Sequence, residues 1–414
     1  MRTPLFILLL FATLTAAAQK PVSPRKAYKP IRTALKAKKP ADALATIRKL
    51  AADTTYNSDP RLYAFGVEAQ LLLCEGFNEK LYLGQKIDTA QFFTANYDLC
   101  LFILQCDTAE QRRIAAAADS AAPRKATPTD VYRRQHRPLL KQYYPNLSAA
   151  GRFHYRKRQF AEARKYFAMC FALPEHPLWG SDTAVTATPA YRDNIYLDFR
   201  AMYELKQYDE MPARTEQLLA DSVLHGQVLD MLVTAANGRG DSTAYFALVE
   251  QGLREDPARL DYFAALANRY TGSGNYAAAV ALADTLLAHD PMNPYFLICR
   301  SLSLFKLGRL EESVIAAERL VAIDSTAAIG YYILGYNLVD RAEKVQFPRQ
   351  TRSPLYQSAK QRQTELFTEA RTYVERLREL APDEPDLWAP LLYKIYLNLN
   401  LGKEFEEIER LLAH

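Results

Sequence analysis

The sequence predicts an all-α fold in which helical hairpins stack into a solenoid. Related text recurs every 34 residues in the second half of the chain, for example GRGDSTAYFALVEQGLREDP ending at Pro257 and GSGNYAAAVALADTLLAHDP ending at Pro291. Each of these copies opens with glycines, which can take the turn between two antiparallel helices. Each also ends in a proline, which would stop the second helix. A period of this length is typical of a stacked array of repeats.

Five frames, beginning at residues 192, 226, 260, 294 and 328, show where the two helices of a repeat lie. Position 4 is apolar in every frame, as Ile195, Leu229, Phe263, Leu297 and Tyr331. With position 11 it forms an apolar stripe two turns long, which predicts a first helix. Position 15 is the turn, occupied by Gly240, Gly274 and Gly308. Positions 17 to 27 belong to a second helix, which in the first frame would run from Tyr208 to Leu218.

The most regular copy, LDYFAALANRYTGSGNYAAAVALADTLLAHDPMN, begins at Leu260, and YYILGYN follows with an aromatic residue and Leu-Gly at Leu334 and Gly335. This pattern resembles the tetratricopeptide repeat (TPR), which has the same period and the same order of helix, turn, helix and proline. The resemblance implies a right-handed superhelix with an extended concave groove. Asp198 and Arg300 stand where the family usually has leucine, so their frames are less regular.

The rest of the chain divides around this array. Residues 19–172 predict divergent helical hairpins with a flexible loop at 107–130, which includes the low-complexity stretch IAAAADSAAPRKATPTD. Residues 173–190 form a connecting insertion. The TPR array then covers 191–414 and holds a further insertion at 341–363, between two helices that normally join through a short turn. We expect this second insertion on an edge of the superhelix, where it limits access to the groove.

The first residues, MRTPLFILLLFATLTAAAQK, have the layout of a secretory signal peptide: a basic start, a short apolar run and small residues before Gln19. The expected signal peptide is residues 1–18. The apolar run is shorter than the roughly 20 residues that span a bilayer. Two stretches, NEKLYLGQKIDTAQFFTANYDLCLFILQCD and YYPNLSAAGRFHYRKRQFAEARKYF, are similar to exported TPR proteins of Bacteroidetes-type bacteria, a group largely without assigned function. We expect an exported protein, either periplasmic or extracellular and associated with the cell surface.

The charge of the chain bears on its partners, and its cysteine content bears on disulfide bonding. A net charge of +5 is too mild to indicate nucleic acid. Residues 20–40 nevertheless hold eight Lys or Arg and no acid. This stretch either contacts an anionic membrane surface or forms a solvated start to the mature chain. The five cysteines are scattered and odd in number, which favours small apolar packing residues over a disulfide framework.

No pattern in the sequence indicates catalysis, a cofactor or a metal. The six histidines make no zinc-type pair, and there is no nucleophile elbow, phosphate-binding loop or Cys-x-x-Cys. His289 and Asp290 are adjacent and resemble a dyad. They stand, however, at the end of a predicted second helix, where a histidine commonly meets the helix dipole. We therefore expect a non-catalytic protein that needs no cofactor.

The groove implied by the TPR resemblance is the candidate binding site. In TPR proteins it is lined by first-helix positions such as 2, 5, 9 and 12, and the chaperone-tail receptors place Lys and Asn at positions 5 and 9. That charged clamp is absent here, which leaves an uncharged, partly aromatic surface suited to apolar or extended peptide segments. Alternatively, the tyrosines pack against the next helix. The predicted partner-binding residues are Tyr196, Arg200, Tyr203, Asn268, Phe305, Tyr332 and Tyr336.

Together these patterns predict a non-catalytic exported scaffold that binds a protein or peptide partner in the cell envelope through the TPR groove. No nucleic acid and no integral membrane span are expected. Two alternatives stay open: a structural component of an outer-membrane or secretion assembly, and a glycan-capture protein built on TPR units. The lack of a lipid-anchor cysteine counts against glycan capture. The identity of the partner, the oligomeric state and the choice between periplasm and cell surface also stay open.

Overall fold

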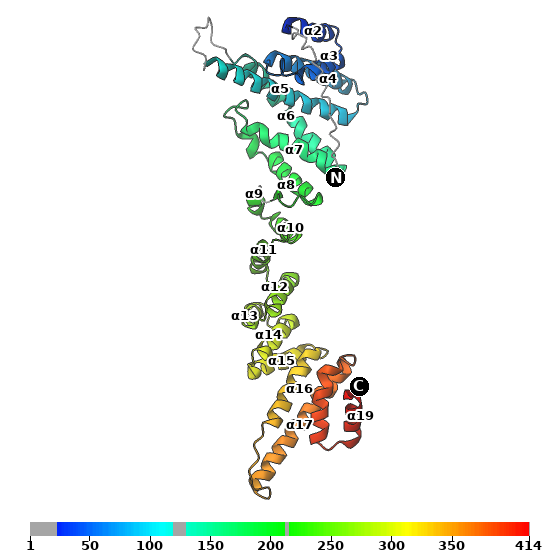
Figure 1. Cartoon of the computed structure of the whole chain (residues 1–414), viewed down its shortest axis with the longest axis vertical. Coiled ribbons are helices and arrows are strands. Elements are labelled where there is room, and N and C mark those ends of the chain that lie inside the picture. The colour runs from blue at the N-terminus through cyan, green and yellow to red at the C-terminus, as the bar shows by residue number, and fades with distance from the viewer. Residues whose placement is uncertain (1–22, 119–129, 212–214, 414) are drawn as a thin grey trace, which may run out of the picture. The chain divides into compact units, whose positions relative to one another are not determined.

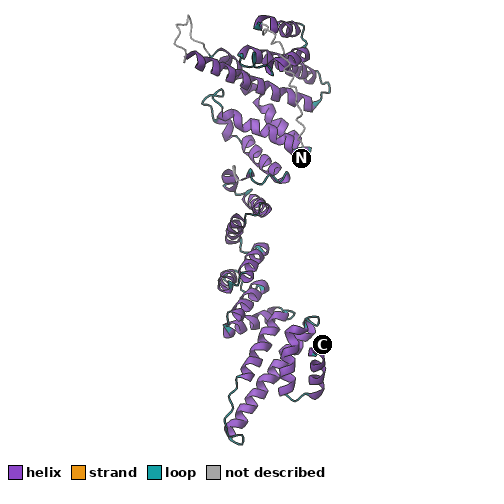
Figure 2. Cartoon of the chain, viewed as in Figure 1, coloured by secondary structure: helices purple, strands orange, loops and turns teal. Residues whose placement is uncertain are grey.

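A computed structural model describes residues 23–118, 130–211 and 215–413, and all regular structure within them is helical (Figure 2). Consecutive helices form antiparallel hairpins, as the labels in Figure 1 allow the reader to follow. The predicted all-α fold of TPR-like helical hairpins is therefore confirmed. The predicted signal peptide, residues 1–18, lies outside the described residues.

The chain forms two compact units, which we treat separately: unit 1 ends at Val228 and unit 2 begins at Leu229. The division falls inside helix α10, His225–Gly238. Unit 1 contains α1 Pro24–Ala27, α2 Lys29–Lys36, α3 Pro40–Ala51, α4 Pro60–Tyr82, α5 Thr89–Ala118, α6 Val131–Arg156, α7 Phe160–Glu175, the 3-10 helix η1 Ala184–Ala187, α8 Pro189–Glu204 and α9 Thr215–Leu219. Unit 2 continues with α11 Ser242–Glu255, α12 Leu260–Gly272, α13 Tyr276–Leu287, α14 Pro294–Lys306, α15 Leu310–Ile323, α16 Ala328–Glu343, α17 Pro354–Leu380, α18 Pro385–Asn398 and α19 Gly402–Leu412.

The hairpin turns of unit 2 explain why glycine recurs in the sequence. Gly274, between α12 and α13, has a φ of 74°, a left-handed conformation that costs a residue with a side chain about 1–2 kcal/mol. The next residue, Asn275, donates its backbone N–H to the carbonyl of Tyr270 over 2.8 Å, which closes the end of α12. The Asn275 side chain in turn accepts from the backbone N–H of Ala278 and caps α13. One short turn thus ends one helix and begins the next.

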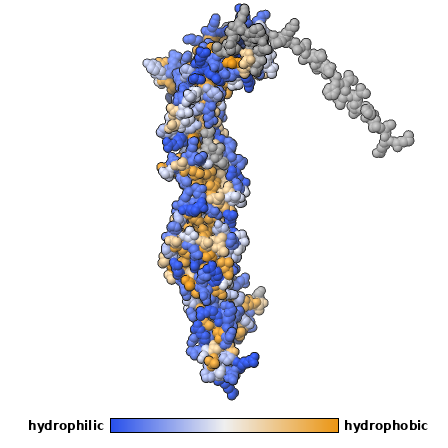
Figure 3. Space-filling view, turned by 90° about the vertical axis from the view of Figure 1, so that its left-hand side faces the viewer, coloured by the Kyte–Doolittle hydropathy of each residue, from blue (hydrophilic) through white to orange (hydrophobic). Residues whose placement is uncertain are grey.

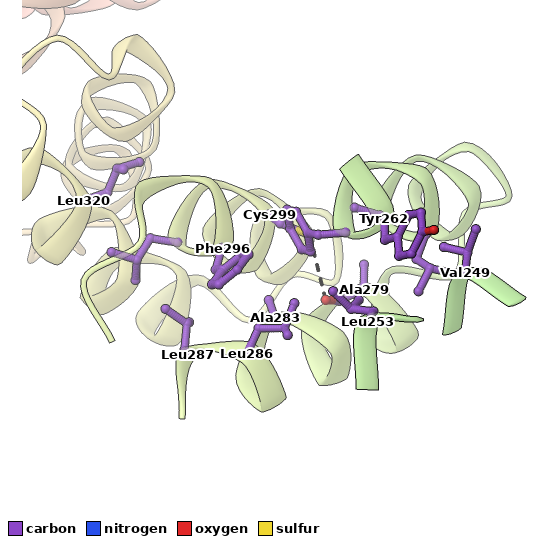
Figure 4. Packing of buried hydrophobic residues seen from close by; sticks show 14 of the residues in the cluster. Val249, Leu253, Tyr262, Ala279, Ala283, Leu286, Leu287, Phe296, Cys299 and Leu320 are labelled. Carbon is purple, nitrogen blue, oxygen red and sulfur yellow. Dashed lines mark hydrogen bonds between the residues drawn. The ribbon is translucent and has the colours of Figure 1, made fainter. Parts of the chain in front are cut away.

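One core cluster of unit 2 consists of buried apolar side chains from neighbouring hairpins, between Val233 and Ala327 (Figure 4). The rings of Phe263 and Phe296 meet edge to face at 4.7 Å between centroids, which joins α12 to α14. Cys299 is buried there, and its thiol donates to the carbonyl of Ala279. Gly252 allows α11 to approach α12 closely, because a Cβ at that position would lie 2.3 Å from the ring of Tyr262.

The predicted flexible loop at residues 107–130 is wrong over its first half, because α5 continues to Ala118. Alanine has a high helix propensity, so the alanine run that suggested low complexity extends the helix instead. Side chains of this extension also hold the start of α6. Glu110 accepts from the backbone N–H groups of Tyr132 and Arg133, and Asp107 pairs with the Arg133 guanidinium at 2.7 Å. Residues 119–129 of the predicted loop lie outside the described residues.

The predicted insertion at 341–363 is also mostly helical. Helix α16 continues to Glu343 and α17 begins at Pro354, so only residues 344–353 connect them. Ser353 caps α17 by accepting from the backbone N–H of Tyr356 at 3.2 Å, and Pro354 occupies the first helical position. The two helices therefore lengthen together into a long hairpin. The placement of this connection beside a binding groove stays a prediction.

The first frame of the array has a shorter second helix than predicted. In place of a helix from Tyr208 to Leu218, the structure has turns at 208–210 and the short helix α9. Residues 212–214 lie outside the described residues. The connecting insertion predicted at 173–190 is non-helical from 176 to 188 apart from η1. Its flanking helices α7 and α8 pack together, and Arg164 of α7 pairs with the buried Asp198 of α8 at 3.2 Å. The chain therefore stays one compact unit across this insertion.

Candidate functional site

In the first helices of the repeats of unit 2, one side is buried and another is partly exposed. The two sides correspond to the predicted repeat positions. In α14, position 4 is Leu297, which is fully buried, whereas positions 5 and 9, Ile298 and Leu302, are half-buried. In α16, positions 5 and 9 are Tyr332 and Tyr336, also half-buried. Positions 5 and 9 lie one helical turn apart, so their side chains share one side of the helix. We call the surface formed by these residues and Phe305 the first-helix face of unit 2.

An aromatic cluster joins α14 to α16 on this face. The ring centroid of Phe305 lies 5.7 Å from that of Tyr332 and 4.9 Å from that of Tyr336, both close to edge to face. The two tyrosine rings are 6.1 Å apart. These spacings are those at which aromatic rings attract each other beyond the burial of their area. The structure thus brings Phe305 against two tyrosines that lie 27 and 31 positions later in the sequence.

The two tyrosines are neither core residues nor free surface residues. Tyr332 packs against a small buried cluster of Ala317, Ile333 and Leu334, and burial raises the pKa of its hydroxyl, with a smaller contribution from Tyr336. Within the described part of the chain, neither tyrosine hydroxyl makes a hydrogen bond. The rings are therefore held in place by packing while their hydroxyls stay available to donate and accept.

The remaining predicted residue of unit 2, Asn268, is exposed at position 9 of α12. Its partner at position 5 is the small, exposed Ala264. Neither position 5 nor position 9 carries a charge in α12, α14 or α16. Three consecutive repeats thus lack a cationic pair that could grip a carboxylate. Figure 3 shows hydrophobic and hydrophilic residues intermixed on the visible surface.

The other three predicted residues belong to unit 1 and lie on α8. The Tyr196 hydroxyl donates to the side-chain oxygen of Gln227 in α10 over 2.8 Å, and the Arg200 guanidinium lies 5.8 Å from the Tyr196 ring centroid. Tyr203 instead contacts Tyr208, with ring centroids 6.2 Å apart. Tyr196 and Arg200 therefore form a pair, whereas Tyr203 packs within its own hairpin.

Two tyrosines that lie beside the predicted site residues were not predicted from the sequence. Tyr155 of α6 lies near Arg200, which lowers its pKa, although burial raises that pKa more strongly. Tyr373 of α17 packs against the same small core as Tyr332. Its repeat position was hidden because the connection between α16 and α17 displaces the second helix from the 34-residue register. The only signal in the sequence that could have identified these two residues was the aromatic character of the helices that flank the predicted ones.

The cysteines of the chain are not placed for nucleophilic chemistry. All five cysteines are free and buried, and burial raises the pKa of Cys74 and of Cys100 to about 12. Thiols in that state are poor nucleophiles. Over the described ranges, no group of three His, Cys, Asp or Glu could hold a metal ion. None of the helices described in either unit is long and apolar enough to cross a bilayer.

The basic segment predicted at residues 20–40 is described from residue 23. Its apolar residues Tyr28, Ile31 and Leu35 are buried, which turns the cations of α1 and α2 outward. These cations line a shallow hollow of about 540 Å³, formed by Arg25, Lys26, Lys29, Arg32, Thr33 and Lys36. The hollow therefore presents positive charge on one face of unit 1.

No family model and no curated protein matches the sequence. Solved structures of TPR proteins match it distantly. The C-terminal part of a TPR repeat-containing protein from Cytophaga hutchinsonii is 13% identical, with 63% of this chain and 92% of that chain covered and a TM-score of 0.33. A TPR repeats protein from Bacteroides fragilis is 11% identical, with 65% and 98% covered and a TM-score of 0.25. The TPR2AB domain of yeast Sti1, solved in complex with pHSP90, is 16% identical, with 62% and 99% covered and a TM-score of 0.24.

Proposed function

We propose that the protein is a non-catalytic scaffold that binds an extended segment of a protein partner through the first-helix face of unit 2. The observation that carries this proposal is the cluster of Phe305, Tyr332 and Tyr336. Its rings are fixed by mutual contacts, and its two tyrosine hydroxyls have no hydrogen-bond partner among the described residues. The face thus combines rigid apolar surface with unused polar groups.

This combination suits an extended peptide for two physical reasons. Tyrosine offers a large contact area at a low cost in conformational entropy, because only two torsions must be fixed. Its hydroxyl can also satisfy the backbone N–H or C=O groups that an extended segment would otherwise leave unpaired. Ile298 and Leu302 continue the face along α14 and would take apolar side chains of the same segment.

We further propose that this binding takes place outside the cytoplasm, in the cell envelope. The support is the tripartite pattern of the first residues, which is typical of a secretory signal peptide. N-terminal sequencing of the mature protein tests this step directly, and a start near Gln19 is the expected result. Intact Met1 on cytoplasmic material would contradict it.

A photo-crosslinking amino acid placed at single sites in cells tests which face binds. We expect Tyr336 replaced in this way to capture a discrete partner, and mass spectrometry to map the contact to one continuous segment of that partner. The matched control is Ile315, which is 57% exposed on the second helix α15 of the same unit. The proposal requires that the Ile315 position does not capture that segment.

The outcome also separates the alternatives. Equal capture of the segment from Ile315 and Tyr336 would contradict a specific first-helix face. A stoichiometric membrane complex that co-purifies with the protein would favour a structural role in an outer-membrane or secretion assembly. Saturable binding on a glycan array, lost on replacement of Tyr332 and Tyr336, would favour glycan capture.

A further inference from the structure

A cleft of about 610 Å³ lies between the second helices α11 and α13 of unit 2, with α12 contributing to its wall. Its apolar surface comes from all three helices, with Leu253 on α11, Leu266 on α12, and Leu282 and Leu286 on α13. Polar side chains line the same cleft: Glu250, Arg254, Tyr270, Thr285 and His289. This volume is within the range of about 300–1,000 Å³ that is usual for small-molecule sites. The cleft lies on second helices and is separate from the first-helix face.

The next repeat shows why this cleft is open. Residues 34 positions apart are equivalent, so Ala278, Ala281 and Thr285 of α13 correspond to Glu312, Ile315 and Arg319 of α15. The guanidinium of Arg319 donates to the carbonyl of Pro291 over 2.7 Å, across the space between α15 and the end of α13. The equivalent proline in the cleft is Pro257. The long side chain of Arg319 thus spans the space in the next repeat, whereas the cleft has the small Thr285 at that position.

The walls of the two spaces also differ in polarity. The equivalent of Leu266 in the next repeat is Arg300, whose guanidinium pairs with Asp284 at 2.6 Å. Asp284 is in turn the equivalent of Glu250. An ion pair thus stands in the second space where the first presents leucine.

The two charged side chains that line the cleft, Glu250 and Arg254, differ in their partners. Glu250 already accepts from the Tyr270 hydroxyl at 3.4 Å and lies 3.8 Å from the Arg269 guanidinium. Arg254 forms no ion pair with any residue in the described ranges, and its equivalent in the next repeat is Ala288. An unpaired guanidinium beside apolar surface is complementary to a ligand with an anionic head and an apolar body. Guanidinium groups pair especially well with carboxylates, through two parallel hydrogen bonds.

We propose that this cleft binds a monocarboxylate with an aliphatic body. The carboxylate pairs with Arg254, and the aliphatic body lies against Leu253, Leu266, Leu282 and Leu286. His289 stands beside them as a further hydrogen-bond donor, whereas the Thr285 hydroxyl already donates to the carbonyl of Ala281. A free fatty acid and the C-terminus of an apolar peptide share this chemistry. The site is independent of the partner-binding face proposed above.

Calorimetric titration of the full chain with decanoate and with N-acetyl-Leu-Leu-Leu tests the site and distinguishes the two sources. At least one carboxylate should bind saturably at one site, and its methyl ester should bind about tenfold or more weakly, since a charge-assisted hydrogen bond is lost. Arg254→Gln should weaken the carboxylate by a similar factor. Tighter binding of decanoate indicates a free fatty acid, and tighter binding of the peptide indicates a C-terminus.

A double variant gives the cleft the larger side chains that stand at the equivalent positions of α15. Ala281→Ile with Thr285→Arg should abolish binding, because the isoleucine adds bulk to the wall and the arginine would span the cleft toward Pro257 as Arg319 spans the next space toward Pro291. The matched control is Arg319→Gln, which should leave binding unchanged. If the double variant fails to fold, Arg254→Gln decides, since that side chain is exposed and unpaired in the described chain. No saturable binding by either carboxylate up to about 1 mM, or equal binding by wild type and Arg254→Gln, would overturn the proposal.

Discussion

At three of the turns between its paired helices, unit 2 places Gly240, Gly274 and Gly308, whereas unit 1 places Lys38, Arg158 and Lys206 at three of its turns. All six have a positive φ, between 52° and 74°. The hairpin geometry therefore requires the left-handed conformation in both units. Unit 2 meets it mainly with glycine, which adopts it without strain, and unit 1 mainly with lysine and arginine; Gly84 of unit 1 and Asn400 of unit 2 are the exceptions. This difference teaches why the repeat is visible in the sequence of unit 2 and faint in that of unit 1.

The two units also differ in what they bury. Among the described residues, the buried acidic and histidine side chains belong to unit 1: Asp107, Glu110, His136, His154 and Asp198. Unit 2 buries smaller uncharged polar residues, such as Ser301, Ser303, Ser313 and Asn337. Unit 1 therefore depends on specific polar contacts between helices, and unit 2 on apolar layers. The two tryptophans report on the units separately, since Trp179 is buried in unit 1 and Trp388 in unit 2.

The largest effect is expected when a buried charge of unit 1 loses its partner. Asp107→Ala would leave the Arg133 guanidinium, whose side chain is only 19% exposed, without its carboxylate. We expect unit 1 to lose about 3 kcal/mol of stability, since an uncompensated buried charge is costly. Denaturation is followed by Trp179 fluorescence in a Trp388→Phe background.

The matched control for this prediction is an exposed ion pair of unit 2. Asp340→Ala breaks the contact with Lys344, whose side chain is 70% exposed, and should cost less than about 1 kcal/mol. Trp388 reports this change in a Trp179→Phe background. Equal losses from the two variants would show that the polar contacts of unit 1 do not distinguish it from unit 2.

A smaller effect is expected at the glycine turns. Gly274→Ala puts a side chain at a φ of 74° and should destabilise unit 2 by about 1–2 kcal/mol, as measured by Trp388 fluorescence. Gly272 is the control, because it ends α12 without a positive φ and has open space around it. Gly272→Ala should be neutral or slightly stabilising. A neutral Gly274→Ala would mean that the turn does not constrain this hairpin.

The converse change should stabilise unit 1. Arg158, in the turn between α6 and α7, has a φ of 59°, so Arg158→Gly removes the strain of the left-handed conformation. We expect a gain of up to about 1 kcal/mol, reduced by the extra freedom of glycine in the unfolded chain. Arg156→Gly, in the last turn of α6, should instead destabilise by about 0.5 kcal/mol. Destabilisation by both variants would contradict the role assigned to Arg158.

The smallest expected effect on stability is the dependence of unit 1 on pH. Burial lowers the pKa of His136 below its ordinary value of 6.5, although Glu110 and Asp107 raise it in part. The unfolded chain then binds more protons than the folded one, so unit 1 should lose stability as pH falls through about 6.5. Burial raises the pKa of Asp98, which acts in the opposite direction, but only in the lower range where carboxylates titrate. Denaturation of unit 1 at about pH 7.5 and pH 5.5 measures the loss, which His136→Gln should abolish. An unchanged loss in that variant would assign it to other groups.

The fold of unit 2 could be predicted because its local signals agree. The turn glycines, the caps at Asp241 and Asn275, and the stripe through Phe263 and Leu297 all specify the same helices. Unit 1 could be predicted only in outline. The end of α5 depends on Glu110 and Asp107 meeting the start of α6, a contact between residues more than 20 positions apart that no local pattern shows.

The sequence predicted the repeat positions of the candidate site residues, but not which of them contact each other. The period placed Tyr332 and Tyr336 at positions 5 and 9, and the structure brings them together with Phe305. It could not show that Tyr203 would pack against Tyr208, because the second helix of that frame is short. The cleft between α11 and α13 was missed because small residues on a second helix read as ordinary packing until the equivalent positions of α15 are compared.

The central claim is that the first-helix face of unit 2 binds an extended protein segment. The most direct test is the affinity of the segment identified by crosslinking, measured for wild type and for Tyr332→Ala with Tyr336→Ala. The account predicts a loss of about 100-fold or more, since central tyrosines of an interface contribute about 2 kcal/mol each, while Tyr245→Ala on α11 leaves the affinity unchanged. The unit 2 transition should stay within a few degrees of wild type. An unchanged affinity would contradict the claim, and a large drop in the melting temperature of unit 2 would show that these tyrosines belong to the core.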